Sequence, residues 1–102
     1  MVYSFLYVTA ADEEEAKNIS KLLLEKKLIA CANIFPIKSM YWWKGKITEE
    51  SEVVLILKTL MEKVAAVKSE IEKIHSYKIT CITEIKVEPN EKYGRWLKEQ
   101  IE

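Results

Sequence analysis

Three side chains in this sequence could bind a transition metal through nitrogen or sulfur. His75 is the only histidine, and Cys31 and Cys81 are the only cysteines. Imidazole and thiolate are common ligands of copper and zinc, but a dedicated site within one chain usually shows them at short, fixed spacings. No C-x-x-C or H-x-x-x-H spacing occurs here. These three residues are therefore candidate ligands for a soft ion such as copper, with a partner chain completing the ligand set.

Each of the three also has a purely structural interpretation, and we favour that interpretation. His75 falls where a helix should end, and the helix dipole stabilises an imidazolium at that position. Cys31 and Cys81 fall within apolar stretches expected to be strands, where a free cysteine usually packs as a small hydrophobe. Nothing in the sequence marks either thiol as an activated nucleophile, so we expect no enzymatic activity.

Composition and charge exclude several other classes of function. Gly45 and Gly94 are the only glycines, whereas phosphate-binding loops need several glycines within a few residues. Sixteen basic residues balance sixteen acidic ones, so no net field attracts nucleic acid or anionic lipid. No apolar run approaches the roughly 20 residues of a membrane helix, and the N-terminus lacks the basic region of a signal peptide. We expect a cytoplasmic protein with reduced thiols and without a nucleic-acid or membrane partner.

The residues that could do chemistry are positioned by alternating strands and helices. Apolar or β-prone stretches predict extended segments at Val2–Thr9, Leu28–Phe35, Lys38–Trp43, Glu52–Thr59 and Lys78–Val87. Apolar residues at helical spacing predict helices from the N-cap Asp12 to about Lys27, from Met61 to His75, and from Asn90 to Glu102. Pro36 is expected to end the second strand, and Gly45 to form a turn.

This order predicts one α+β domain over residues 1–102, with the ferredoxin-like β-α-β-β-α-β plan and an added C-terminal helix. Glu15 has capping-box spacing from Asp12. The acidic run Asp12–Glu15 could hold a cation, but we interpret it as a helix N-terminus. The second acidic run, Thr48–Glu52, we interpret as a solvated turn.

Both faces of the predicted sheet are apolar. In the stretch Glu52–Thr59, Leu55 and Leu57 alternate with Val54 and Ile56. Helices on one side of a sheet leave its other face bare, and a short terminal helix is small for covering it. We therefore expect copies of the chain to cover one another. Tyr41, Trp42 and Trp43 extend this argument, because neighbouring residues of a strand point to opposite sides and aromatics are enriched at association surfaces.

Several motifs together resemble those of the CutA family, the divalent-cation tolerance proteins. They are "LIACANI" from Leu28, "YWWKGKI" from Tyr41, "EVVLILKT" from Glu52 and "HSYKI" from His75. The resemblance implies a ferredoxin-like subunit related in architecture to PII signalling proteins and assembled as a homotrimer. It also implies a role in tolerance to copper and other divalent metals, without established catalysis or an obligatory cofactor. Clefts between subunits would hold any ligand, lined by Tyr41, Trp43, Lys58 and Tyr77, with Cys31 nearby.

Two departures from the family pattern concern the metal ligands. The family pattern H-P-Y-x-x-P-E reads H-S-Y-K-I-T-C from His75 to Cys81, so both prolines and the acid are missing. A cysteine linked to copper in some members corresponds here to Val8.

The resemblance and the candidate ligands leave two functions. The first is a trimeric metal-tolerance protein that binds metal, and the alternative is a PII-like signalling or scaffold module that holds a small anion in its inter-subunit clefts, with Lys58 as a counter-charge.

Overall fold

The elements of the structure follow the predicted order. The computed structural model describes residues 2–102. Its elements are β1 (Tyr3–Ala10), α1 (Glu13–Glu25), β2 (Cys31–Trp43), β3 (Lys46–Leu60), the 3-10 turn η1 (Met61–Lys63), α2 (Val64–Ile74), β4 (Ile82–Val87) and α3 (Glu91–Ile101). The strands form one antiparallel sheet in the order β2-β3-β1-β4. The predicted α+β, split β-α-β plan is therefore confirmed.

Two strand boundaries differ from the sequence prediction. β2 does not end before Pro36 but continues through it, with Pro36 opposite Val53 of β3. Proline is tolerated there because β2 is an edge strand and a missing N–H need not break a ladder on its outer side. β4 begins at Ile82 rather than Lys78, so Cys81 lies in the connection that precedes the strand.

The long β2–β3 hairpin is closed by a two-residue turn. Lys44 and Gly45 both have positive φ, at 51° and 77°. Two consecutive residues of positive φ are typical of the tight turn whose twist matches that of the flanking strands. The predicted turn at Gly45 is confirmed, and the strands on either side of it run much further than the apolar residues alone suggested.

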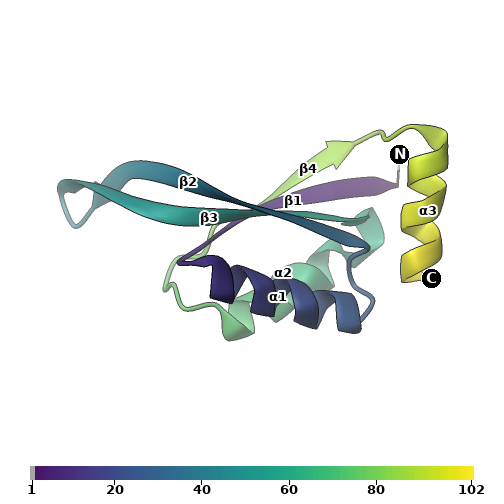
Figure 1. Ribbon diagram of the computed structural model, residues 1–102, viewed down its shortest axis with the longest axis horizontal. Helices are drawn as coiled ribbons and strands as arrows, with labels where there is room; N and C mark the ends of the chain where they lie inside the picture. The colour runs from purple at the N-terminus through teal and green to yellow at the C-terminus, as the bar shows by residue number, and fades with distance from the viewer. Residues whose placement is uncertain (1) are drawn as a thin grey trace.

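One face of the sheet packs on α1 and α2. Figure 1 shows these two helices side by side under the sheet, while the β2–β3 hairpin extends beyond them. The core consists of alternate strand residues, the apolar faces of the two helices and one residue of the α1–β2 connection: Leu6, Val8, Ala10, Leu55 and Leu57 from strands, Ala16, Ile19, Leu23, Val64, Val67 and Ile71 from helices and their starts, and Ile29 from the connection.

The other face, called here the second face, is covered by α3 only at the end far from the hairpin tip (Figure 1). Along β1, Tyr3 and the core residue Leu6 point to opposite faces of the sheet. Tyr3 lies against Gly94 of α3, where a Cβ added to the glycine would come within 2.9 Å of the Tyr3 ring. Further along, large apolar side chains remain exposed: Phe35, Trp43 and Ile85. One short helix therefore does not cover this face, as the sequence predicted, and assembly into a trimer stays a prediction.

The first helix begins with the predicted capping residues. The Asp12 side chain accepts a 2.8 Å hydrogen bond from the Glu15 N–H, and the Glu15 carboxylate accepts one of 2.9 Å from the Ala11 N–H. A capping box usually returns to the N–H of the N-cap itself, so this one is displaced by one residue. Across residues 2–102, no helix is both long enough and apolar enough to cross a membrane.

Candidate functional site

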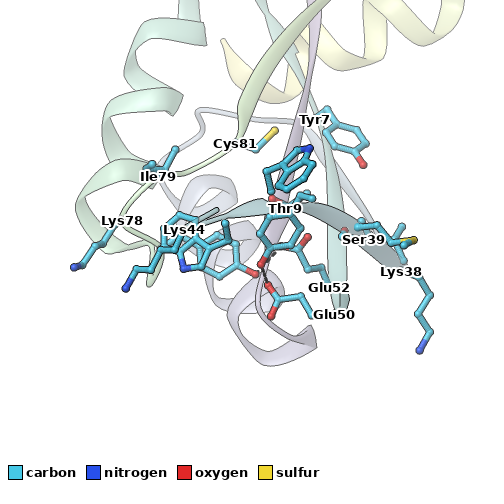
Figure 2. Close-up of a pocket in the computed structure, with 16 residues that line it drawn as sticks. Tyr7, Thr9, Lys38, Ser39, Lys44, Glu50, Glu52, Lys78, Ile79 and Cys81 are labelled. Carbon is cyan, nitrogen blue, oxygen red and sulfur yellow. Dashed lines mark hydrogen bonds between the residues drawn. The ribbon is translucent and has the colours of Figure 1, made fainter. Parts of the chain in front are cut away.

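A cavity of about 990 Å³ lies on the second face, between the β2–β3 hairpin and the connection from α2 to β4. β1 contributes its floor, β2 contributes aromatic side chains, and β3 contributes two carboxylates (Figure 2). We call this space the hairpin cavity. Its lining residues are Tyr7, Thr9, Ile37, Lys38, Ser39, Met40, Tyr41, Trp42, Trp43, Lys44, Glu50, Glu52, Tyr77, Lys78, Ile79 and Cys81.

Two tyrosine–glutamate pairs are the main polar feature of the hairpin cavity. The Tyr41 hydroxyl donates to Glu50, and the Tyr77 hydroxyl donates to Glu52 at 2.7 Å. The hydrogen bond to Glu50 raises the pKa of Tyr41 to about 12. Burial, followed by the hydrogen bond to Glu52, raises the pKa of Tyr77. Both phenols therefore stay protonated near neutral pH and act as hydrogen-bond donors to the carboxylates.

Tyr77 is held in place by the buried ring of His75. The Tyr77 N–H donates to His75 Nδ1 at 3.0 Å, and His75 Nε2 lies 2.7 Å from the Thr9 carbonyl oxygen. A backbone N–H can only donate, so Nδ1 must be the acceptor and Nε2 must carry the proton. The side chain of His75 is fully buried, and its ring centroid lies 4.7 Å from that of Tyr77.

Glu15 joins the α2–β4 connection to the start of α1. Its Oε2 accepts from the Ser76 N–H at 2.9 Å and lies 3.9 Å from His75 Nδ1. Burial alone would raise the pKa of Glu15, but the hydrogen bonds from the Ala11 and Ser76 N–H groups outweigh burial and lower it. One carboxylate thus caps a helix and positions the backbone next to Tyr77.

The three candidate metal ligands do not converge within one chain. Cys81 is exposed at the hairpin cavity, with its Sγ 3.7 Å from Thr83 Oγ1. Cys31 is half-buried at the start of β2, opposite Lys58, and does not line the cavity. His75 already uses both ring nitrogens. Within residues 2–102, no group of three or more His, Cys, Asp or Glu side chains is arranged to hold a metal ion.

The expectation that Cys81 packs as a small hydrophobe inside a strand was wrong. The strand begins one residue later, and the side chain of Cys81 is exposed. The apolar alternation that suggested a strand from Lys78 continues without strand pairing, since the register of β4 with β1 begins at Ile82 opposite Val8.

The residues expected in a cleft are only partly brought together. Tyr41, Trp43 and Tyr77 all line the hairpin cavity. Lys58 does not: its Nζ donates to the Tyr93 hydroxyl at 3.2 Å and lies 5.3 Å from the centroid of the Phe5 ring. Lys58 therefore belongs to the packing of α3 on the sheet. Whether either region lies between subunits stays a prediction.

Glu50 and Glu52 were missed by the sequence analysis, which interpreted Thr48–Glu52 as a solvated turn. This run lies in β3, and the Glu52 side chain is buried, with 8% of the residue exposed. Glutamates at positions i and i+2 of a strand share a face. The signal that could have revealed them is the length of the hairpin: a strand beginning just after Gly45 would place both on the same face as Tyr41.

Comparison with known proteins gives consistent matches along the chain. Residues 4–100 match the family model for "CutA1 divalent ion tolerance protein". The divalent-cation tolerance protein CutA of Archaeoglobus fulgidus is 48% identical over 102 residues, covering 99% of this chain and all of that protein. Its solved structure, described as that of a periplasmic divalent cation tolerance protein, superposes with a TM-score of 0.95 over 98% of this chain and 99% of that one. CutA1 from Pyrococcus horikoshii superposes with a TM-score of 0.93 at 39% identity, over 97% of this chain and 98% of that one.

Proposed function

From its membership of the CutA1 divalent ion tolerance family, shown by the match over residues 4–100, we propose that the chain supports tolerance of copper and related divalent metals by binding them as a homotrimer. Tolerance to divalent cations is the property that names the family. The observation that favours direct binding is Cys81, an exposed free thiol at the rim of a cavity that also contains carboxylates. Thiolate is a soft ligand suited to copper and zinc.

Assembly is part of the proposal because one chain supplies too few donors. The described residues contain no cluster of three or more metal-binding side chains. Cys31 begins β2, an edge strand, and Cys81 directly precedes β4, the other edge strand. Donors at opposite edges of one sheet can meet when a second copy packs beside the first. His75 could join them only by giving up its hydrogen bond from the Tyr77 N–H.

Metal titration of the full-length protein tests this proposal. We expect copper and zinc to bind with submillimolar affinity by calorimetry, with three metals per trimer if each site is shared between two neighbouring chains. Cys81→Ser should weaken binding at least tenfold, and Cys31→Ser and His75→Ala should weaken it less. Ser39→Ala, at another position in the hairpin cavity, is the matched control. Binding weaker than millimolar, or unchanged by all three ligand variants, would overturn the proposal, and light scattering of the apo protein measures the trimer separately.

A non-catalytic role in the cytoplasm completes the proposal. The raised pKa values of Tyr41 and Tyr77 make both phenols poor general bases near neutral pH. Cys31 and Cys81 are free thiols, as is usual in a reducing compartment. Cell fractionation with a thiol-labelling reagent that cannot cross membranes tests the location: labelling of Cys81 in intact cells would contradict it.

Binding of a small anion is the alternative function, and Lys58 is the residue that favours it. Lys58 is half-buried, and within residues 2–102 it forms no salt bridge with a carboxylate. Glu50 and Glu52 would repel an anion from the hairpin cavity, so an anion would have to bind beside Lys58 and Tyr93. A thermal-shift screen of nucleotides and organic acids tests this alternative, and Lys58→Gln should abolish any stabilisation found.

A further inference from the structure

The hairpin cavity combines aromatic walls with negative charge that no basic side chain compensates. Glu52 is buried, and within residues 2–102 neither Glu50 nor Glu52 forms a salt bridge. Figure 2 shows the side chains of the three lining lysines extending away from both carboxylates: Lys38, Lys44 and Lys78. A buried carboxylate is normally paired with a cation, because removing its charge from water is costly. Glu52 accepts a hydrogen bond from Tyr77 but has no cationic partner within residues 2–102, and this carboxylate without a counter-ion is the observation that points to a ligand.

The walls of the cavity suit an organic cation better than a bare metal ion. Aromatic residues that line the cavity on the second face include Tyr7, Tyr41, Trp43 and Tyr77. Hard metal ions such as calcium need six or more oxygen ligands, whereas an ammonium group is attracted to aromatic faces and needs only a few acceptors. A Lys44 ammonium already lies 5.9 Å from the centroid of the Trp43 ring, so this ring accepts a cation on its surface.

The two glutamates lie on one face of β3 and suit a ligand with two positive charges. Glu50 and Glu52 are two residues apart on β3, and two residues of a strand span about 7 Å. Each accepts a phenol hydrogen bond, Glu50 from Tyr41 and Glu52 from Tyr77. Glu50 is exposed while Glu52 is buried, so one end of a ligand would be enclosed and the other would stay near solvent.

We propose that the hairpin cavity binds a short aliphatic diammonium, with one ammonium paired to Glu52, the other to Glu50, and the methylene chain against the tyrosine and tryptophan rings. Cys81, the principal proposed metal ligand, also lines this cavity, but no thiol takes part in ammonium binding, and neither Cys31 nor His75 lines it. The two proposals can therefore fail independently.

Calorimetric titration of the full-length protein with 1,4-diaminobutane at low ionic strength tests this inference. We expect saturable binding, with butylamine at least tenfold weaker because it lacks the second charge. Glu52→Gln preserves shape and still accepts from Tyr77, and it should weaken diamine binding at least tenfold; Glu50→Gln should act in the same direction. Glu49→Gln is the matched control, because it removes the same charge from the other face of β3.

Several results would overturn the inference. Two of them are the absence of binding at millimolar diamine and equal affinity for diamine and butylamine. The third is equal weakening by Glu49→Gln and Glu52→Gln, which would show that binding depends only on the overall charge of the protein. Circular dichroism checks that Glu52→Gln folds; if it does not, Glu50→Gln and the comparison of diamine with butylamine decide. Cys31→Ser, outside the hairpin cavity, should leave diamine affinity unchanged, and a loss of affinity in that variant would contradict the site. Absence of diamine binding together with dissociation of the Glu52→Gln oligomer would show that a second copy fills the cavity.

Discussion

Glu15 connects two parts of the chain through one carboxylate, so its charge should control the stability of the connection that holds Tyr77. The perturbation is Glu15→Gln, which keeps the size of the side chain but removes the charge and one acceptor. In the native protein the two oxygens accept from the Ala11 and Ser76 N–H groups, both at 2.9 Å. The variant can keep only one of these two hydrogen bonds, and its acceptor is then an uncharged amide oxygen.

The expected loss is about 2 kcal/mol. Hydrogen bonds to charged groups contribute about 1.5–3 kcal/mol, and the solvent exposure of both bonds places them near the lower limit. A negative charge in the first turn of a helix contributes about 0.3–1 kcal/mol more. For a chain of this length, about 2 kcal/mol lowers the melting temperature by about 8 °C.

The effect should depend on pH with a definite sign. The pKa of Glu15 is lower in the folded protein than its ordinary value of 4.5. A carboxyl group with a lowered folded pKa stabilises the protein fully above its unfolded pKa, and this contribution is lost as the pH falls through the folded value. The difference between wild type and Glu15→Gln should therefore be largest at neutral pH and shrink below about pH 4.5.

Urea denaturation at fixed protein concentration, at pH 7 and pH 3, measures this difference. Glu13→Gln is the matched control, because Glu13 lies in the same turn of α1 but is exposed and forms only a 3.1 Å surface ion pair with Lys17. Such pairs contribute about 0.5 kcal/mol or less. Equal destabilisation by the Glu15 and Glu13 variants, or a Glu15→Gln effect that is the same at both pH values, would refute the reasoning.

Three further predictions concern packing and ionisation. Gly94→Ala adds a Cβ 2.9 Å from the Tyr3 ring, and this close contact offsets the gain in helix propensity. In a Tyr3→Ala background the same substitution should raise the free energy of unfolding by about 1 kcal/mol. Additive effects of the two substitutions in the double-mutant cycle would contradict this prediction. Leu23→Ala empties a fully buried position and should cost about 2–5 kcal/mol in urea denaturation, whereas Leu24→Ala, at an exposed position, should cost under about 1 kcal/mol. Tyr41 should ionise near pH 12 in an absorbance titration, and Tyr41→Phe should remove that step; loss of a step near pH 10.0 instead would show that its hydrogen bond is absent in solution.

Patterns within a short stretch of sequence were enough to predict much of the fold. The apolar spacing of α1, the Asp12 cap and the turn at Gly45 all depend on residues close to one another, and all are confirmed. The extended segments Leu28–Phe35 and Lys38–Trp43 were also predicted. The sequence did not predict that they form one continuous strand, because Pro36 is compatible with a strand only when that strand lies at an edge, and edge position is set by the whole sheet.

The site depended on contacts that the sequence does not display. Tyr41 and Tyr77 were picked out as cleft residues, yet the carboxylates that bind their hydroxyls were assigned to a solvated turn. Glu52 is buried, and its carboxylate accepts a hydrogen bond from Tyr77, 25 residues away. His75 was found as a candidate ligand, but only the structure shows both of its ring nitrogens already bonded.

By itself, the sequence determined the order of the elements, the two-sided apolar sheet and the family, because each of these is encoded in local periodicity and contiguous motifs. The tertiary structure decided which charges are buried together. The hydrogen bond from the Tyr77 hydroxyl to Glu52 joins the α2–β4 connection to β3, and strand register leaves Cys31 far along the sheet from Thr9, the residue that His75 contacts. Burial of a charge is a property of everything that packs around it, so it follows from the fold rather than from any stretch of chain.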